Sequence, residues 1–193
     1  MQNHFKSSLY QLGVTLVELM VVIAIVGIIS SIAIPSYRGM VIDNRVESMA
    51  SNLYSALVLA RTEARNRGQV VTLCNSSNAD APPPAIPVCD GATATGWGTG
   101  WLVFVDTNND GARANTEVLI KVQGQVIANA ANGSIVSTDT NAGPVNSISF
   151  SATGQATRAI KFSINAPSNA VSSSKAVCVS LGGRAHIGKL TDC

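Results

Sequence analysis

The sequence contains few charged and few aromatic residues. Only 12% of its 193 residues are Asp, Glu, Lys or Arg and only 5% are aromatic, whereas Ser, Thr, Asn, Gly and Ala are abundant. Soluble domains average about 25% charged residues, so this composition favours an extracytoplasmic, β-rich domain with uncharged polar loops over a cytosolic helical enzyme. The formal net charge of +2 is too small to indicate nucleic-acid binding by itself. The length allows one compact domain plus an accessory segment.

Sequence signatures of catalysis are missing as well. The chain has no glycine-rich phosphate-binding loop, no Gly-x-Ser-x-Gly motif and no triad of metal ligands. Its two histidines, His4 and His186, lie near opposite ends of the chain. We expect Trp97 and Trp101 to anchor a sheet against a helix rather than to bind a sugar. The sequence therefore predicts a protein that is not an enzyme and has no cofactor, with calcium at one loop as the alternative.

Only four cysteines are present, in two local pairs with fourteen residues between the partners of each: Cys74, Cys89, Cys178 and Cys193. Four cysteines allow three connectivities, and the sequential one closes two short loops, each worth about 3 kcal/mol. A metal site is the alternative, but the chain lacks a Cys-x-x-Cys motif and has few histidines. Disulfides are favoured, which indicates an oxidising compartment outside the cytoplasm.

One long apolar run lies near the N-terminus. Residues 1–13 are polar, and residues 14–34, just before Pro35, contain a single charged residue, Glu18. A helix of this length spans about 30 Å, enough to cross a bilayer. A secretory signal would have a shorter apolar core followed by a cleavage site, whereas this run leads directly into further helix. The segment is predicted to be a membrane anchor.

Glu18 needs an explanation in such an anchor. A carboxylate inside a spanning helix costs a few kcal/mol in lipid, so it usually has a partner. One candidate partner is the N-terminal amine of a neighbouring subunit. That amine would exist if the leader were removed between Gly13 and Val14.

After Pro35 the pattern becomes that of an amphipathic helix, predicted to continue to Gly68. Its apolar positions recur every three or four residues and define one face: Ile42, Val46, Met49, Leu53, Leu57, Ala60 and Ala64. The opposite face carries the polar residues Arg38, Asp43, Arg45, Glu47, Ser51, Asn52 and Arg61. The basic last turn, with Arg65 and Arg67, suits the helix dipole better than a ligand site.

From residue 69 onward the sequence is β-rich. Short runs have the composition of strands: residues 69–74, 101–105, 117–122, 147–151, 158–164 and 176–181. We therefore predict an α+β fold in which a long N-terminal helix packs on antiparallel sheet. The predicted segments are a leader (1–13), a transmembrane helix (14–35), its amphipathic continuation (36–68) and a β-rich globular domain (69–193).

The start of the apolar run resembles the class III leader junction of type IV pilins and pseudopilins, on the string Gly13-Val14-Thr15-Leu16-Val17-Glu18. The resemblance implies that a prepilin peptidase cuts after Gly13 and methylates the new N-terminal amine. It also implies that Glu18 supports docking of one subunit beneath another and that Pro35 lets the helix loosen outside the membrane. Val14 departs from the pattern, because the family more often has Phe or Met there.

Later motifs resemble the GspH/FimT/FimU group of minor pilins and pseudopilins. They are ARTEARNR (60–67), GWGTGW (96–101), FVD (104–106) with NDG (109–111), FSATG (150–154) and GR (183–184). The resemblance implies the type IV pilin fold, with two small sheets packed on the helix. It also implies a single-pass inner-membrane subunit with a periplasmic domain that later sits at the pilus tip and primes assembly.

The same resemblance implies the partners of the chain. These would be other minor and major pilins or pseudopilins, prepilin peptidase and the inner membrane. The two cysteine pairs and the basic C-terminal loop favour a type IV pilus over a type II secretion pseudopilus.

One loop has the spacing of a calcium site. Oxygen ligands would come from Asp106, Asn108, Asp110 and Glu117, with Gly111 allowing the sharp turn. Strand-like sequence flanks both sides, however, and Asn and Asp before Gly are also typical of a tight turn between strands. The plain turn is the favoured interpretation.

The C-terminal segment is basic. Arg184, His186 and Lys189 on a glycine-rich loop could reach phosphates, so DNA is a possible partner. DNA-binding FimT proteins have a Gly-Arg-x-Arg motif in this region, but here His186 replaces the second arginine and is mostly neutral at pH 7. No aromatic residues interleave the cations for base stacking. An edge strand with solvated charges is the favoured interpretation.

Overall fold

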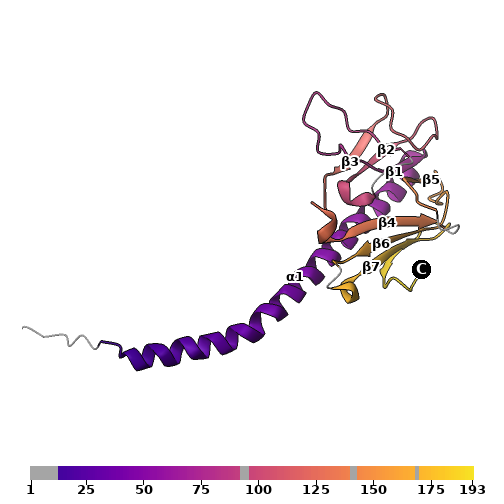
Figure 1. Cartoon of the computed structure of the whole chain (residues 1–193). Helices are drawn as coiled ribbons and strands as arrows, with labels where there is room; N and C mark the ends of the chain where they lie inside the picture. The colour runs from indigo at the N-terminus through magenta and orange to yellow at the C-terminus, as the bar shows by residue number, and fades with distance from the viewer. Residues whose placement is uncertain (1–12, 92–95, 140–142, 168–169) are drawn as a thin grey trace, which may run out of the picture. The chain divides into compact units, whose positions relative to one another are not determined.

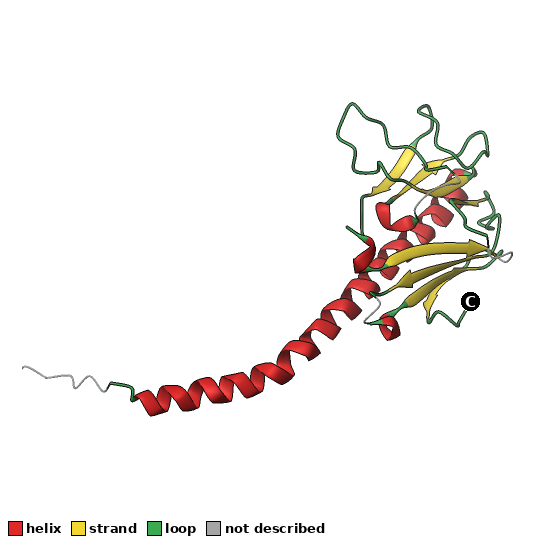
Figure 2. Ribbon diagram, viewed as in Figure 1, coloured by secondary structure: helices red, strands yellow, loops and turns green. Residues whose placement is uncertain are grey.

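The computed structural model describes residues 13–91, 96–139, 143–167 and 170–193 (Figure 1). The chain divides into two units, Met1–Met40 and Val41–Cys193. Helix α1 (Leu16–Arg67) contributes residues to both units. The strands belong to the second unit, where they form two sheets (Figure 2).

Helix α1 ends at the stop that the sequence predicts. Gly68 has a φ of 63°, a left-handed conformation that glycine adopts without steric cost. The N–H of Gln69 donates to the carbonyl of Ala64 at 3.3 Å, which is the hydrogen bond of a Schellman C-cap. The chain is thereby redirected from the helix into the first strand.

The first sheet is antiparallel, with the strand order β3-β2-β1-β5. Its strands are β1 (Val71–Asn75), β2 (Trp101–Val105), β3 (Leu119–Gln123) and β5 (Ser147–Phe150). Every residue of β1 and β2 is buried, because the inner side chains join the main core and the outer ones lie under the loops that follow β1 and β2. Burial on both faces explains why these strands are almost continuously apolar.

The second sheet is also antiparallel, with the order β4-β6-β7-β8. Its strands are β4 (Ser134–Asp139), β6 (Ile160–Asn165), β7 (Lys175–Val179) and β8 (Ala185–Gly188). Strand β6 alternates buried and half-buried residues, so one face of this sheet lies on the core and the other is open. Short 3-10 helices, η1 (Trp97–Thr99), η2 (Ala130–Asn132) and η3 (Val171–Ser173), lie in the connections.

The main core lies between α1 and the inner faces of both sheets (Figure 1). The predicted apolar face of the helix is confirmed, since all of its members belong to this cluster. Two further alanines of α1, Ala50 and Ala56, are also fully buried. Together these residues carry the helix side of the core: Ile42, Val46, Met49, Ala50, Leu53, Ala56, Leu57, Ala60 and Ala64.

Both tryptophans are buried in this core, as expected. The ring nitrogen of Trp97 donates to Ser137 Oγ at 2.9 Å and to the carbonyl of Val145 at 3.0 Å. Its ring meets Phe162 edge-to-face at a centroid distance of 4.9 Å, a favoured geometry for aromatic pairs. Trp97 therefore fastens the segment before β2 to the second sheet.

Two strands of the described residues lie outside the predicted runs. Strand β8 is the edge strand favoured for the C-terminal segment. Strand β4 was not predicted, because its alternation is masked by polar residues: Ser137 points inward to Trp97 while Val136 is 43% exposed. The remaining strands lie within a few residues of the predicted runs.

Candidate functional site

Helix α1 begins immediately after the predicted cleavage point. Gly13, Val14 and Thr15 precede the helix, while residues 1–12 of the predicted leader lie outside the described residues. The Oγ1 of Thr15 accepts the backbone N–H of Glu18 at 3.2 Å, so Thr15 is the N-cap and Glu18 occupies the third helical position. The Thr-x-x-Glu spacing is the sequence signal of this capping role, which was not among the predicted features.

The apolar side chains that follow are open to their surroundings. Between residues 14 and 34, every large apolar side chain keeps between 51% and 75% of its surface exposed. By length and composition, α1 could cross a membrane. Among the described residues, Glu18 takes part in no ion pair. Exposed apolar surface of this extent requires an apolar environment, such as lipid or other helices.

Helix α1 continues through Pro35. Proline has no N–H, so the regular hydrogen bond to the carbonyl of Ser31 is missing at this position. This creates a local weak point in an otherwise regular ladder. The loosening of the helix at Pro35 stays a prediction.

The cysteines form two disulfides in the sequential connectivity. Cys74 bonds to Cys89 with a Cα–Cα distance of 5.6 Å, and Cys178 bonds to Cys193 with a distance of 5.7 Å. The first disulfide holds the loop after β1 over the outer face of the first sheet, where Cys74 is fully buried beside Leu102. The second ties the C-terminal residue to β7.

The loop after β2 uses two carboxylates to hold its own backbone. Asp106 Oδ2 accepts the N–H of Gly111 at 3.1 Å. Glu117 accepts the N–H of Thr107 at 2.8 Å through Oε1 and that of Ala114 at 2.9 Å through Oε2. Both carboxylates are buried, so they substitute for the water that would otherwise solvate these amides.

The other two predicted calcium ligands also bond within the turn. Asn108 donates to Asp110 Oδ2 at 2.8 Å, and Asp110 Oδ1 accepts the N–H of Ala112 at 2.8 Å. Across the described ranges, no three His, Cys, Asp or Glu side chains are placed to hold a metal ion. One oxygen, Asp106 Oδ1, is buried without a hydrogen-bond partner. These are the bonds of the plain turn, and calcium binding stays a prediction.

The three cations predicted to contact DNA do not share one loop. Arg184 lies in the turn between β7 and β8, whereas His186 lies on β8 opposite Cys178. Lys189 begins the final turn, where its N–H donates to Asp192 Oδ2 at 2.6 Å. Residues 185–188 form the favoured edge strand rather than part of one glycine-rich basic loop, and DNA contact by these three cations stays a prediction.

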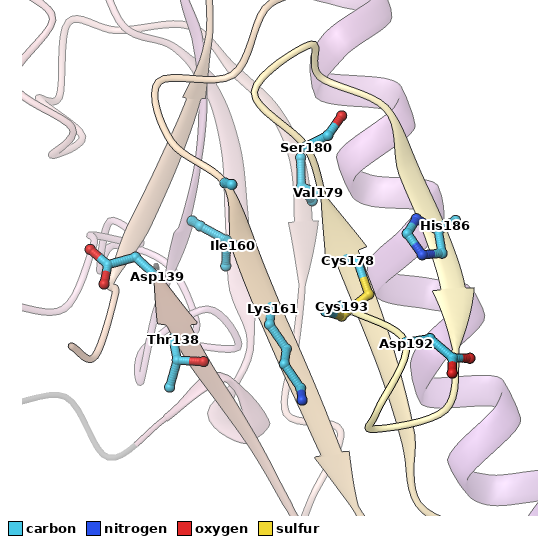
Figure 3. A pocket seen from close by; sticks show the side chains of 11 residues that line it. Thr138, Asp139, Ile160, Lys161, Cys178, Val179, Ser180, His186, Asp192 and Cys193 are labelled. Atoms are coloured by element: carbon cyan, nitrogen blue, oxygen red, sulfur yellow. A yellow bond between two sulfur atoms is a disulfide. The ribbon is translucent and has the colours of Figure 1, made fainter. Parts of the chain in front are cut away.

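A hollow of about 400 Å³ lies over the outer side of the second sheet (Figure 3). The C-terminal tail shapes it, because the Cys178–Cys193 disulfide folds the tail back onto the sheet. The Lys161 ammonium donates to the carbonyl of Leu190 on this tail. His186 and Asp192 line the same hollow, so His186 faces the tail and not a free basic loop.

Arg61 connects α1 to two distant turns. Its Nε donates to the carbonyl of Gly154 at 3.0 Å and its Nη2 to the carbonyl of Gly182 at 2.9 Å. The helical pattern places Arg61 on the polar face of the helix, and the structure shows it half-buried there because backbone carbonyls accept its guanidinium. The partners lie 93 and 121 residues further along the chain, so no local pattern could reveal them.

Two families match the sequence. The family described as "Type II transport protein GspH" matches residues 49–183. The one described as "Prokaryotic N-terminal methylation motif" matches residues 9–34, which include Gly13, Glu18 and the exposed apolar part of α1. No curated protein matches the sequence.

Solved structures share the fold at low sequence identity. The type IV minor pilin FimU of Pseudomonas aeruginosa matches with a TM-score of 0.52 and 18% identity, over 75% of this chain and 88% of that one. The minor pseudopilin EpsH from the type II secretion system of Vibrio cholerae matches in two structures. In one structure the TM-score is 0.52 and the identity 10%, over 78% of this chain and 98% of that one. In the other the TM-score is 0.50 and the identity 13%, over 77% of this chain and 99% of that one. These similarities establish the type IV pilin fold, as the sequence predicts.

Proposed function

The chain belongs to the GspH family of minor pilins and pseudopilins, and on that basis we propose that it acts as a non-catalytic minor pilin of a type IV pilus. The observation that carries the proposal is the junction at the start of α1. An exposed apolar helix begins at Leu16, three residues after Gly13, with Glu18 in its first turn, within the part of the chain that matches the N-terminal methylation motif.

In this proposal the subunit is first held in the inner membrane by residues 14–34, with Val41–Cys193 in the periplasm. Prepilin peptidase cuts after Gly13 and methylates Val14. Helix α1 then leaves the lipid and enters the filament, where neighbouring helices cover its exposed apolar side chains. Glu18 pairs there with the N-terminal amine of an adjacent subunit, since an ionised carboxylate in an apolar bundle requires a partner.

Glu18→Ala tests this assignment. The variant should insert into the membrane and be cleaved normally, yet be reduced about tenfold or more in filaments sheared from the cell, because a paired charge in a water-poor environment contributes more than about 1.4 kcal/mol. Thr15→Ala is the matched control, since it removes only the N-cap and should cost helix stability alone. Normal incorporation of Glu18→Ala would exclude the docking role.

The choice of a pilus over a secretion pseudopilus has its own test. Deleting the gene should reduce surface filaments and leave protein secretion unchanged. Loss of secretion with normal filaments would assign the subunit to a type II secretion system instead. In both cases the pilin-type role of the helix would stand.

Binding of DNA is the second candidate function. One observation favours it: Arg184 lies two residues after Gly182, whose carbonyl accepts Arg61 Nη2 from the end of α1 at 2.9 Å, so two cations lie near this turn. A gel shift of the domain spanning residues 41–193 at two salt concentrations should then show salt-sensitive binding that Arg184→Ala weakens. Lys189→Ala serves as the control, because Lys189 lies in the separate C-terminal turn. Absence of binding at low salt would exclude this function.

A further inference from the structure

The two disulfides lie in different surroundings. Cys74 is fully buried, and the Sγ of its partner Cys89 accepts the N–H of Arg113 at 3.3 Å. Cys178 is 6% exposed, but Cys193 is the one cysteine of the four that is classed as exposed to solvent. Disulfide exchange requires direct attack on a sulfur atom, so a thiol reagent can reach the second disulfide through Cys193 while the protein stays folded.

The loop closed by the first disulfide is also held by several hydrogen bonds. The N–H of Asp90 donates to the carbonyl of Asn75 at 2.9 Å, and the N–H of Ser77 donates to Asp90 Oδ1 at 3.0 Å. The guanidinium of Arg113, from the loop after β2, donates to the carbonyl of Pro87 at 2.7 Å. These bonds keep the loop closed over the buried disulfide sulfur, so the first disulfide is protected by its own loop.

The segment after β8, residues 189–193, has fewer attachments, and we name it the C-terminal strap. The Lys161 ammonium donates to the carbonyl of Leu190. The bond from the Lys189 N–H to Asp192 Oδ2, at 2.6 Å, lies within the strap itself. In the part of the chain that the structure describes, no ion pair joins the strap to the domain. The strap is therefore attached chiefly by the second disulfide and one hydrogen bond.

The strap lies over the outer face of the second sheet (Figure 3). Lys161, Cys178 and His186 are in register on β6, β7 and β8. They point away from the core, because the residues that alternate with them along these strands pack in it. Asp192 and Cys193 of the strap line the hollow on this face. The strap is therefore one wall of the hollow, and the hollow would lose this wall if the strap moved away.

Cys178 has a basic side chain on each side of it on this face. The strand register places Lys161 on one side and His186 on the other (Figure 3). An ammonium or a protonated imidazole stabilises a neighbouring thiolate, and a stabilised thiolate leaves faster in disulfide exchange. The carboxylate of Asp192 belongs to the strap and would move away with it. These surroundings favour Cys178 as the leaving group when Cys193 is attacked.

We propose that the C-terminal strap is a redox-sensitive cover of the outer face of the second sheet, opened by a dithiol and closed by oxidation. A thiolate of the dithiol attacks Cys193 Sγ, so the bond between the two cysteines breaks and Cys178 leaves as a thiolate. The second thiolate of the dithiol then attacks the mixed disulfide and releases Cys193. The dithiol becomes a disulfide, and the two cysteines gain two electrons and two protons. The reverse exchange, with a disulfide as the oxidant, closes the strap.

Opening the strap changes the outer face and leaves the core unchanged. The open form frees the Lys161 ammonium and the Cys178 thiol and removes one wall of the hollow. The main core lies on the opposite side of the sheet, so it does not depend on the strap. The alternative is a static staple, in which both disulfides resist reduction until the domain unfolds. The inference concerns the chain by itself and does not depend on a role in filaments.

Graded reduction of the full chain in detergent micelles tests the proposal. The chain is incubated with dithiothreitol without denaturant, its free thiols are alkylated, and mass spectrometry measures each cysteine. Cys178 and Cys193 should be alkylated about tenfold faster than Cys74 and Cys89, because exchange begins at an exposed sulfur. Tryptophan emission should stay unchanged, since both tryptophans are buried in the core. Equal rates for the two pairs, or a shift of the emission as the second disulfide opens, would overturn the proposal.

His186→Glu supplies a second arm. A carboxylate opposite Cys178 disfavours the leaving thiolate, so this variant should slow reduction of the second disulfide by about threefold or more at neutral pH. His186→Gln is the matched control and should stay within about twofold of the natural chain, because it adds no charge. A strand that was merely loosened by the substitution would be reduced faster. Unchanged or faster reduction of His186→Glu would therefore overturn the proposed exchange at Cys178.

Carboxypeptidase digestion measures the position of the strap itself. The double variant Cys178→Ala with Cys193→Ala should lose C-terminal residues about fivefold faster than the natural chain, because a strap held chiefly by one hydrogen bond opens locally. Tryptophan emission is compared in the same samples, so that digestion reports the strap and not unfolding. Equal resistance of the two chains would show that the strap stays closed without its disulfide, and the proposal would then be wrong.

Discussion

At the scale of single residues, two positions hold the sheets and the helix end together. Arg61 bonds to the carbonyls of two turns, Gly154 and Gly182, that come from different sheets. Gly183 allows these turns to touch, since a Cβ built on it would lie 2.0 Å from the carbonyl oxygen of Gly154. The family signature at residues 183–184 therefore has a packing reason that is independent of any ligand.

Arg61→Ala should lower the free energy of unfolding of the domain by about 1–2 kcal/mol, because two carbonyls lose a charged donor that is partly exposed to water. Arg61→Lys should recover part of this loss. The measurement is urea unfolding of residues 41–193. Arg45→Ala, at an exposed position of the same helix, should change stability by less than about 0.5 kcal/mol. Equal effects at both positions would refute the bridging role.

Gly183→Ala should destabilise the domain by about 2 kcal/mol or more. The residue has a φ of 75° and no room for a methyl group, so both strain and a backbone clash oppose alanine. Gly182→Ala is the neighbouring control, because its nearest neighbour would be 3.9 Å away and its φ is unstrained. Thermal unfolding of the two variants should separate them clearly, and similar midpoints would contradict the packing argument.

At the scale of elements, the connections are held by covalent and polar bonds because they bury little apolar surface. The loop after β1 depends on the Cys74–Cys89 disulfide, and the tail depends on the Cys178–Cys193 disulfide. The loop after β2 instead depends on the buried carboxylates of Asp106 and Glu117. Regular elements need no such devices, since helix and strand ladders satisfy their own backbone.

Removing either disulfide by a double Cys→Ala substitution should cost about 3 kcal/mol, since each closes a loop with the same sequence separation of 15. The loss should be larger for Cys74 and Cys89, because Cys74 is fully buried in a small apolar cluster and its removal also leaves a cavity. Denaturant unfolding of the two variants would measure the difference. A greater loss for Cys178 and Cys193 would reverse this ranking.

The loop after β2 is expected to hold its shape without calcium. Millimolar calcium should leave the thermal midpoint of the domain unchanged, because the carboxylate oxygens already bond to amides of the loop. Glu117→Ala should lower stability by about 1–3 kcal/mol, because the partly buried hydrogen bonds from the amides of Thr107 and Ala114 lose their acceptor. A calcium-induced rise in the midpoint that Glu117→Ala abolishes would instead establish the calcium site.

At the scale of the whole molecule, one helix serves two environments. Its first part exposes a continuous apolar surface that belongs in lipid or in a helix bundle, whereas its second part buries one face against the sheets. The domain Val41–Cys193 has its own core, which includes the residues of α1 beyond the boundary. Solubility of the domain and insertion of the anchor are therefore separable properties of this chain.

A fragment comprising residues 41–193 should be soluble and folded, whereas a fragment comprising residues 69–193 should not fold. The shorter fragment lacks the helix face that covers the inner side of both sheets, including Leu53 and Leu57, which are fully buried. Loss of several such side chains exceeds the usual stability of a domain, about 5–15 kcal/mol. Circular dichroism and thermal unfolding of both fragments would show the difference. Cooperative unfolding of residues 69–193 would contradict this assignment of the core.

Features that depend on neighbouring residues could be predicted from the sequence alone. Composition and length define the apolar anchor, a 3.6-residue period defines the buried face of α1, and Gly68 marks its end. The Gly13–Glu18 string identifies the pilin-type start. These features are local, because helices and spanning segments form contacts among residues three or four positions apart.

Contacts between distant residues depended on the tertiary fold. Folding brought Arg61 to Gly154 and Gly182, paired β4 with β6 despite a weak strand pattern, and placed Arg184, His186 and Lys189 in three different settings. Such contacts follow from the packing of the two sheets on α1, and sheet pairing is set by burial and register rather than by local propensity. The local sequence pattern therefore determines how the helix of this subunit begins. The surfaces of its globular domain form only when segments distant in the sequence pack together.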